Sequence, residues 1–180
     1  MDLSLDLVYN NFNNMQVLYK DDVYDRIWQP FNFPERKVLS TPLTIDSSSN
    51  IYQPPSSVMS TAMSPAKVSN PMFAFHMKPD DPTAEYYVYM HFAELEKLKA
   101  NESREFFIYE NLELWNVDNQ PFSPQYLSTT TLFNVALAPI SGDQIDYTLF
   151  KTTASTHQPT LNAFENFSQP QTHEQDGTYI

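Results

Sequence analysis

Two short stretches of the sequence combine aromatic and polar side chains of the kinds that bind sugars. The first, VYDRIW, contains Tyr24 and Trp28, and the second, LWNVDNQPF, contains Trp115 and Asp118. An aromatic ring can stack on the C–H face of a sugar while a carboxylate or amide orients its hydroxyl groups. Tryptophan is buried on average, however, so both tryptophans could belong to the core, with Arg26 paired to a carboxylate of the same chain. The residues alone leave sugar binding and internal packing open.

Metal binding is the second kind of chemistry that the residue types allow. His91 and Glu94 lie three positions apart, a spacing that could hold a metal ion on a helix. His91 ends a strand pattern, however, and no second histidine has ligand spacing to it. The acidic turns KDDVYD and KPDDP could offer oxygen ligands to calcium, but neither has the spaced carboxylates and turn glycine of a calcium loop. We therefore expect neither a metal ion nor a cofactor.

A glycosidase is the enzyme alternative, because it needs only two inward carboxylates about 5–10 Å apart across a cleft. The acids to inspect for such a pair are Asp25, Glu94, Glu105 and Asp118. The sequence has no G-x-S-x-G or H-E-x-x-H motif and no cysteine, and its two glycines cannot form a loop that cradles phosphate. We expect a binding module, not an enzyme.

The charge balance argues against nucleic acid as a partner. Asp and Glu number 22 against 10 Lys and Arg, which gives a formal net charge of -12. Phosphate backbones repel that charge, and no basic stripe offsets it. The densest basic group, formed by Lys97, Lys99 and Arg104, alternates with glutamates in the stretch ELEKLKANESRE. We interpret this stretch as a solvated loop with surface ion pairs.

The sequence also carries signals about its compartment. Asp2 and Asp6 lie where a secretory signal has positive charge and then an unbroken apolar run. The longest mostly apolar stretch, Thr131–Ile140, is about half as long as a membrane-spanning helix, so we expect no membrane insertion by this chain. NES at Asn101 and NFS at Asn166 are N-glycosylation sequons. We expect no glycan on the chain expressed alone, and glycans on both asparagines if it is part of a longer exported product.

Short β-strands are the elements that must position these residues. In YYVYMHFA the even positions Val88, Met90 and Phe92 share one face, and Tyr89 and His91 lie on the other. REFFIYEN repeats the alternation, and the polar insert between the two runs is too short for a crossover helix, so we expect an antiparallel pair. Fourteen prolines mark the connections of an all-β sandwich or jelly roll. Further strands are predicted at Gln16–Tyr19, Val58–Ala62, Met72–Met77, Thr130–Ala136 and Tyr147–Thr152.

Four blocks of the chain resemble successive blocks of the malectin-like domain of plant receptor kinases, which usually carry leucine-rich repeats next in the chain. The blocks are DDVYDRIWQPF, VMSTAMSP, YYVYMHFAELEKLKANESREFFIYEN and TLFKTTASTHQPTLNAFE. The resemblance implies a galactose-binding-like β-sandwich of the jelly-roll kind on the extracellular face of the plasma membrane. It implies a carbohydrate, cell-wall or peptide ligand, with a co-receptor or partner lobe as further partners. Family members carry two lobes, and this chain resembles the second, with a lobe over 1–167 and a linker over 168–180.

The resemblance also indicates candidate site residues and leaves one alternative function. Tyr24 and Trp28 are the nearest counterparts of sugar-contacting aromatics, with Asp118 as a third candidate. Alternatively, the lobe packs against a partner lobe or co-receptor without a ligand of its own, which predicts a contiguous apolar patch on one sandwich face. The family's turn Asn-Gly is replaced by Asn111-Leu112, and losing a glycine at positive φ costs about 1 kcal/mol.

Overall fold

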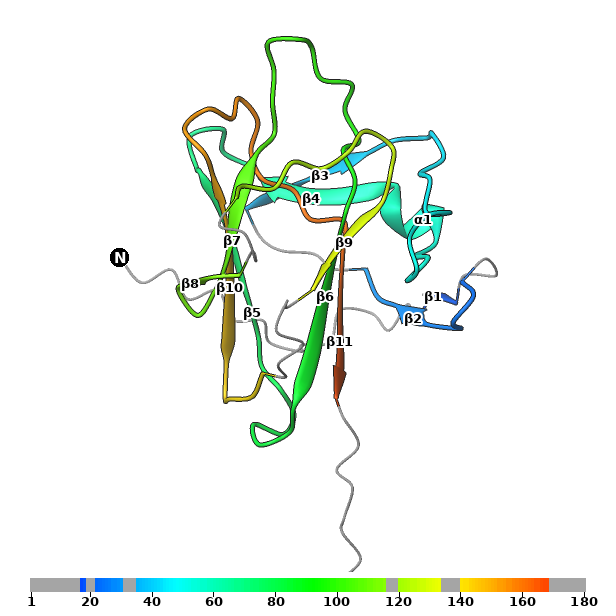
Figure 1. The fold of residues 1–180 in the computed structure, drawn as a ribbon, viewed down its shortest axis with the longest axis vertical. Coiled ribbons are helices and arrows are strands. Elements are labelled where there is room, and N and C mark those ends of the chain that lie inside the picture. Colours follow the sequence, from blue (N-terminus) through cyan, green and yellow to red (C-terminus); the bar gives the residue numbers. More distant parts are fainter. Residues whose placement is uncertain (1–16, 19–21, 31–34, 116–119, 134–139, 169–180) are drawn as a thin grey trace, which may run out of the picture.

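The computed structural model describes residues 17–18, 22–30, 35–115, 120–133 and 140–168. These residues form short strands and one four-residue helix (Figure 1). In chain order the elements are β1 (Val17–Leu18), β2 (Ile27–Trp28), β3 (Arg36–Ser40), α1 (Ser56–Met59), β4 (Thr61–Pro65), β5 (Met72–Met77), β6 (Tyr86–Phe92), β7 (Phe106–Glu110), β8 (Glu113–Leu114), β9 (Thr130–Phe133), β10 (Ile145–Lys151) and β11 (Ala163–Ser168).

Two antiparallel sheets form the body of the molecule. One has the strand order β5-β10-β7-β8 and the other β11-β6-β9. The paired strands β3 and β4 run across one end of both sheets, with α1 beside them, and β1 pairs with β2 beside the sheet that contains β6 and β11 (Figure 1). The predicted all-β sandwich is confirmed.

The core lies between the two sheets because each contributes one mostly apolar face. Val88, Met90 and Phe92 of β6 are 2%, 0% and 0% exposed, as the alternation predicts. They face Phe106 and Ile108 of β7, both fully buried. Burial of each large apolar side chain contributes about 1.5–3 kcal/mol, so this layer is the main source of stability.

The predicted pairing of YYVYMHFA with REFFIYEN is wrong. β6 pairs with β9 and β11, whereas β7 pairs with β8 and β10 in the opposite sheet. The rings of Phe92 and Phe106 meet across the core, with centroids 5.7 Å apart. Two strands that each carry an apolar face bury more surface by facing one another than by lying side by side, and the insert between them crosses from sheet to sheet.

The remaining strand predictions succeed to different degrees. Met72–Met77 coincides with β5, and Tyr147–Thr152 overlaps β10. Val58–Ala62 is wrong in its first half, where the chain forms α1 after Pro55, whose φ of -56° suits the start of a helix. The other two predicted strands overlap β1 and β9, and their remaining residues 16, 19 and 134–136 lie outside the described residues.

Candidate functional site

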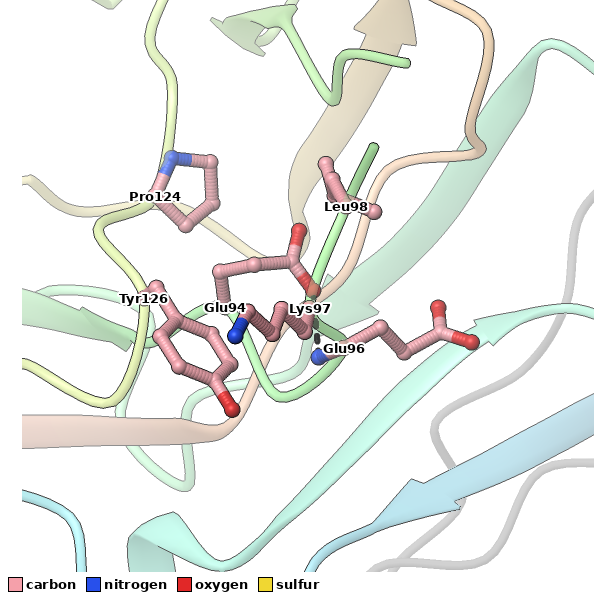
Figure 2. A pocket seen from close by; sticks show the side chains of 6 residues that line it. All are labelled: Glu94, Glu96, Lys97, Leu98, Pro124 and Tyr126. Atoms are coloured by element: carbon pink, nitrogen blue, oxygen red, sulfur yellow. Dashed lines mark hydrogen bonds between the residues drawn. The ribbon is translucent and has the colours of Figure 1, made fainter. Parts of the chain in front are cut away.

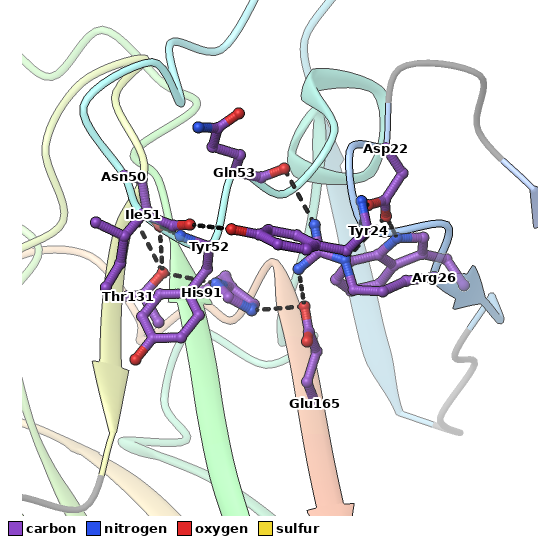
Figure 3. Close-up of polar contacts among 11 residues, drawn as sticks. Asp22, Tyr24, Arg26, Asn50, Ile51, Tyr52, Gln53, His91, Thr131 and Glu165 are labelled. Carbon is purple, nitrogen blue, oxygen red and sulfur yellow. Dashed lines mark hydrogen bonds and ion pairs between the residues drawn. The ribbon is translucent and has the colours of Figure 1, made fainter.

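Arg26 lies at the centre of a polar network on the outer side of the β11-β6-β9 sheet (Figure 3). Its Nε lies 3.0 Å from both carboxylate oxygens of Asp22, and its Nη1 lies 2.8 Å from Oε1 of Glu165 on β11. Its Nη2 donates to the carbonyl of Gln53 at 3.0 Å. All three guanidinium nitrogens therefore bind within the chain, which confirms that Arg26 pairs with an internal carboxylate.

Two aromatic rings enclose this guanidinium. Its central carbon lies 5.2 Å from the ring centroid of Tyr24 and 4.9 Å from that of Trp28, within cation–π range. The indole N–H of Trp28 donates to Oδ2 of Asp22 at 2.6 Å, and the hydroxyl of Tyr24 donates to the carbonyl of Ile51 at 2.8 Å. We call Asp22, Tyr24, Arg26 and Trp28 the clamp, because their contacts attach residues 22–28 to the sheet.

The clamp controls the ionisation of Asp22. Burial alone would raise the pKa of this carboxyl, but hydrogen bonds from Arg26, Trp28 and the backbone of Tyr24 outweigh burial and hold the pKa below its ordinary value. Both carboxylate oxygens of Asp22 therefore already accept hydrogen bonds from within the chain. In the turn KDDVYD, which could have offered oxygen ligands to calcium, the carboxylate of Asp22 accepts hydrogen bonds from the chain's own donors.

His91 continues the network into the sheet. Its Nε2 lies 3.0 Å from Oε1 of Glu165, and its Nδ1 lies 2.7 Å from Oγ1 of Thr131. A hydroxyl, an imidazole and a carboxylate in this order could activate a nucleophile. His91 is fully buried, however, beneath the rings of Trp28 and Tyr52, and the Thr131 hydroxyl is also bound by the amide group of Asn50. The arrangement holds strands together instead of facing a substrate.

An exposed aromatic surface lies next to this network. The ring of Tyr89 on β6 lies 4.7 Å from that of Tyr52, 6.0 Å from that of Phe133 and 5.7 Å from that of Phe167. We call these four residues the aromatic face. Phe133 and Phe167 are 37% and 48% exposed on the outside of the sandwich, where an antiparallel sheet normally turns polar side chains to water. Sequence alternation placed Tyr89 on this side, but did not identify its partners.

The aromatic face extends toward the clamp. Ile51, adjacent to Tyr52, is 73% exposed, and Tyr24, which bonds to it, is 58% exposed. These exposed side chains lie on one sandwich face, where a partner-binding lobe is expected to carry an apolar patch.

A shallow depression lies between the start of the polar insert and the segment of Pro124 and Tyr126 (Figure 2). Its volume is about 290 Å³, and its walls are formed by Glu94, Glu96, Lys97, Leu98, Pro124 and Tyr126. Oε2 of Glu94, one of the lining residues, lies 3.0 Å from Nε of Arg104, and both residues are only 4% exposed. Burial raises the pKa of Glu94 above its ordinary value, although Arg104 opposes the shift. The interpretation of this stretch as a solvated loop is therefore wrong for Glu94 and Arg104.

The other acids considered for catalysis or metal binding are dispersed. Asp25 is exposed on a turn at φ 51°, and Oε1 of Glu105 accepts from the Thr152 hydroxyl at 2.8 Å. In KPDDP, Asp81 accepts bonds from Thr83. Asp118 lies outside the described residues. Within the described ranges no group of three or more acids or histidines is placed to hold a metal ion.

The tryptophans and the sequons can also be placed. Trp28 is half-buried and Trp115 is 7% exposed in the main core. Asn101 is exposed in the turn of the insert. Asn166 is exposed on β11, and its Nδ2 lies 2.8 Å from Sδ of Met77. Across the parts of the chain that are described, no helix has the length and apolar character needed to cross a membrane.

Comparison with known proteins gives consistent matches. A family model described as the malectin-like domain matches residues 4–169. A putative leucine-rich repeat receptor-like protein kinase of Arabidopsis thaliana is 45% identical over 154 residues, which is 85% of this chain and 17% of that protein. A probable leucine-rich repeat receptor-like serine/threonine-protein kinase of the same plant is 43% identical over 171 residues, 91% of this chain and 19% of the relative. The chain thus spans less than a fifth of these relatives.

Solved structures share the fold. The ANX2 ectodomain from Arabidopsis thaliana matches with a TM-score of 0.60 and 19% identity, over 80% of this chain and 44% of that one. A chain in the crystal structure of the plant peptide RALF23 in complex with FER and LLG2 matches with a TM-score of 0.61 and 19% identity, over 84% of this chain and 45% of that one.

Proposed function

The chain belongs to the malectin-like domain family, and from this we propose that it is a non-catalytic recognition lobe of a receptor-like kinase ectodomain. Its ligand is a polypeptide, bound on the aromatic face. The observation that carries the proposal is the exposure of Phe133 and Phe167 beside Tyr52 and Tyr89 on the outside of a sheet. Aromatic side chains concentrated in one exposed patch are typical of protein-binding surfaces.

The clamp supports a polypeptide over a carbohydrate as the ligand. Trp28 is half-buried, its N–H is bound by Asp22, and Arg26 occupies one side of its ring. Tyr24 keeps an exposed ring, but its hydroxyl is bound to the backbone and Arg26 lies against it. Of the three sugar-binding candidates, Asp118 lies outside the described residues. At Tyr24 and Trp28, no free ring face is combined with a free polar group that could hold a sugar.

The comparisons support the setting of this proposal. Among the matched structures, one contains the peptide RALF23 with FER and LLG2, so the fold occurs in a peptide complex. The chain covers less than half of the matched ectodomains, in keeping with one lobe over 1–167 followed by a linker over 168–180. Residues 169–180 lie outside the described residues. We place the lobe on the extracellular face of the plasma membrane, as in a receptor of this family, with a co-receptor or partner lobe as a further contact.

A display experiment tests the proposal. The full chain, with folding checked by circular dichroism, is used to select binders from a random peptide library and is probed in parallel on a glycan array. The double variant Phe133→Ser and Phe167→Ser should lose most selected peptides. The control variant Phe150→Ser and Leu112→Ser, which alters side chains 39% and 91% exposed elsewhere, should keep them. The proposal would be refuted if the chain bound glycans but no peptides, or if the selected peptides bound the Phe133→Ser and Phe167→Ser double variant as well as the unsubstituted chain.

A further inference from the structure

We propose that the polypeptide bound on the aromatic face is basic, with Arg or Lys side chains that stack on the tyrosine rings and pair with acids at both ends of the face. This inference rests on the proposed function and adds the chemical class of the partner. It is carried by the charge around the face and by the way the same surface already holds a guanidinium.

Arg26 shows which side chain this surface accommodates. It lies between the rings of Tyr24 and Trp28 and pairs with Asp22 and Glu165. Aromatic rings combined with carboxylates are the groups that recognise guanidinium and ammonium ions. The aromatic face next to the clamp offers the same ring chemistry, because Tyr52 and Tyr89 lie only 4.7 Å apart between the two exposed phenylalanines.

Exposed acids lie at both ends of this surface. At one end the loop before β6 carries Asp80, Asp81 and Glu85 against a single Lys78, and Glu85 directly precedes the strand. At the other end Asp25 is exposed next to Tyr24. Arg26 leaves no local excess of positive charge, since two carboxylates, Asp22 and Glu165, pair with it.

Charge and length together define the partner. A net charge of -12 attracts a basic segment from a distance and accelerates its encounter with the lobe. The seven residues of β6 span about 20 Å at roughly 3.3 Å per residue, so an extended segment of about six or seven residues covers the length of the strand.

Two labelled decapeptides test the inference by fluorescence anisotropy with the full chain. One consists of five Arg-Leu repeats and the other of five Glu-Leu repeats, so the two share apolar content but differ in charge. We expect only the Arg-Leu peptide to bind. Phe133→Ser with Phe167→Ser, and separately Asp80→Asn with Glu85→Gln, should each weaken its binding about fivefold or more, as expected for lost stacking and ion pairs.

Matched controls separate the aromatic face from general attraction to an acidic chain. Phe150→Ser with Leu112→Ser, and Glu35→Gln with Glu113→Gln, remove the same chemistry elsewhere and should change the affinity less than about twofold. Equal weakening by test and control variants, or equal binding of the Glu-Leu peptide, would overturn the inference. If displayed peptides depend on Phe133 and Phe167 but carry no basic excess, the basic partner is refuted while the proposed function stands. If no displayed peptide depends on them, both are refuted.

Discussion

Nη1 of Arg26 lies 2.8 Å from Oε1 of Glu165, although 139 residues separate the two in the chain. The contact joins the segment that contains β2, near the start of the described chain, to β11 at its end (Figure 3). His91 of β6 binds the same carboxylate oxygen, so one atom of Glu165 links three segments.

Arg26→Lys should destabilise the lobe despite keeping the charge. Lysine cannot present the planar fork that contacts Asp22, Glu165 and Gln53 at once, nor stack as well between the two rings. We expect the free energy of unfolding to fall by about 2 kcal/mol, measured by urea denaturation. The exposed Lys37→Arg provides the control, and equal stability of Arg26→Lys and the unsubstituted chain would contradict the role of the clamp.

Asp22 should make the stability depend on pH. Its pKa in the folded chain is held below the ordinary value, so the ionised form contributes stability above the ordinary Asp pKa and loses it as the pH falls through the folded-state pKa. Asp22→Asn should therefore be less stable at neutral pH, and its deficit should shrink below about pH 4. Urea midpoints across that range check this, with the exposed Asp25→Asn as control. A deficit that does not change with pH would show that ionisation of Asp22 contributes nothing.

Arg104→Met should be severely destabilising, because it leaves Glu94 buried without its cation. The expected loss is about 3–5 kcal/mol at neutral pH. The pKa of Glu94 is already raised, and a raised pKa favours the fold below the unfolded-state pKa and disfavours it as the pH rises. The deficit should therefore decrease in mild acid.

The double variant Glu94→Gln with Arg104→Met isolates this buried charge. It should recover part of the lost stability in thermal denaturation, and the exposed Lys97→Met should have little effect. Identical losses in the single and double variants would mean that packing of the Arg104 side chain, and not charge, determines its contribution.

Leu112→Gly should stabilise the lobe. The turn between β7 and β8 holds Asn111 and Leu112 at φ 48° and 71°, a left-handed conformation that suits Asn-Gly. Leu112 is 91% exposed, so its side chain contributes little packing to offset the strain. We expect a gain of about 1 kcal/mol in the free energy of unfolding. Leu43→Gly, at an exposed position without positive φ, should lower the stability, and a loss in both variants would contradict the strained turn.

Both sequons should be modified when the chain is expressed in plant cells behind an added export signal. Asn101 and Asn166 are exposed, although Asn166 lies on a paired strand and contacts Met77. Mobility on a gel after endoglycosidase treatment, compared with Asn101→Gln and Asn166→Gln, reports the occupancy of each site. A chain with no mobility shift would contradict the extracellular assignment.

The sequence predicts which side of each central strand is buried, but not which strands are neighbours. Alternation in YYVYMHFA places Val88 in the core and Tyr89 outside, as found, because the period of a strand is a local property. Hydrogen-bond partners depend on the path of the chain between strands, so the pairing of β6 with β11 could not be derived from either segment alone. Strands β2, β3, β8 and β11 were not predicted.

The site shows the same division between local and long-range information. The stretch VYDRIW identified the aromatic residues and the internal pairing of Arg26, since Asp22 is only four residues away. Its other partner, Glu165, and the grouping of Tyr52 with Phe133 come from segments far apart in the chain. Burial of Glu94 and Arg104 was missed because alternating charges also describe a solvated loop.

The pairing of β11 also determines how the lobe carries mechanical load. Six residues, from Ala163 to Ser168, pair antiparallel with β6 (Figure 1). A pull applied at Ser168 along the axis of β11 acts parallel to both strands and strains their hydrogen bonds together, in shear, instead of opening them one after another. The Arg26–Glu165 and His91–Glu165 contacts resist the same sliding motion from within the strand. Tension along the axis of β11 is therefore resisted by the whole β11–β6 ladder and the Glu165 contacts at once.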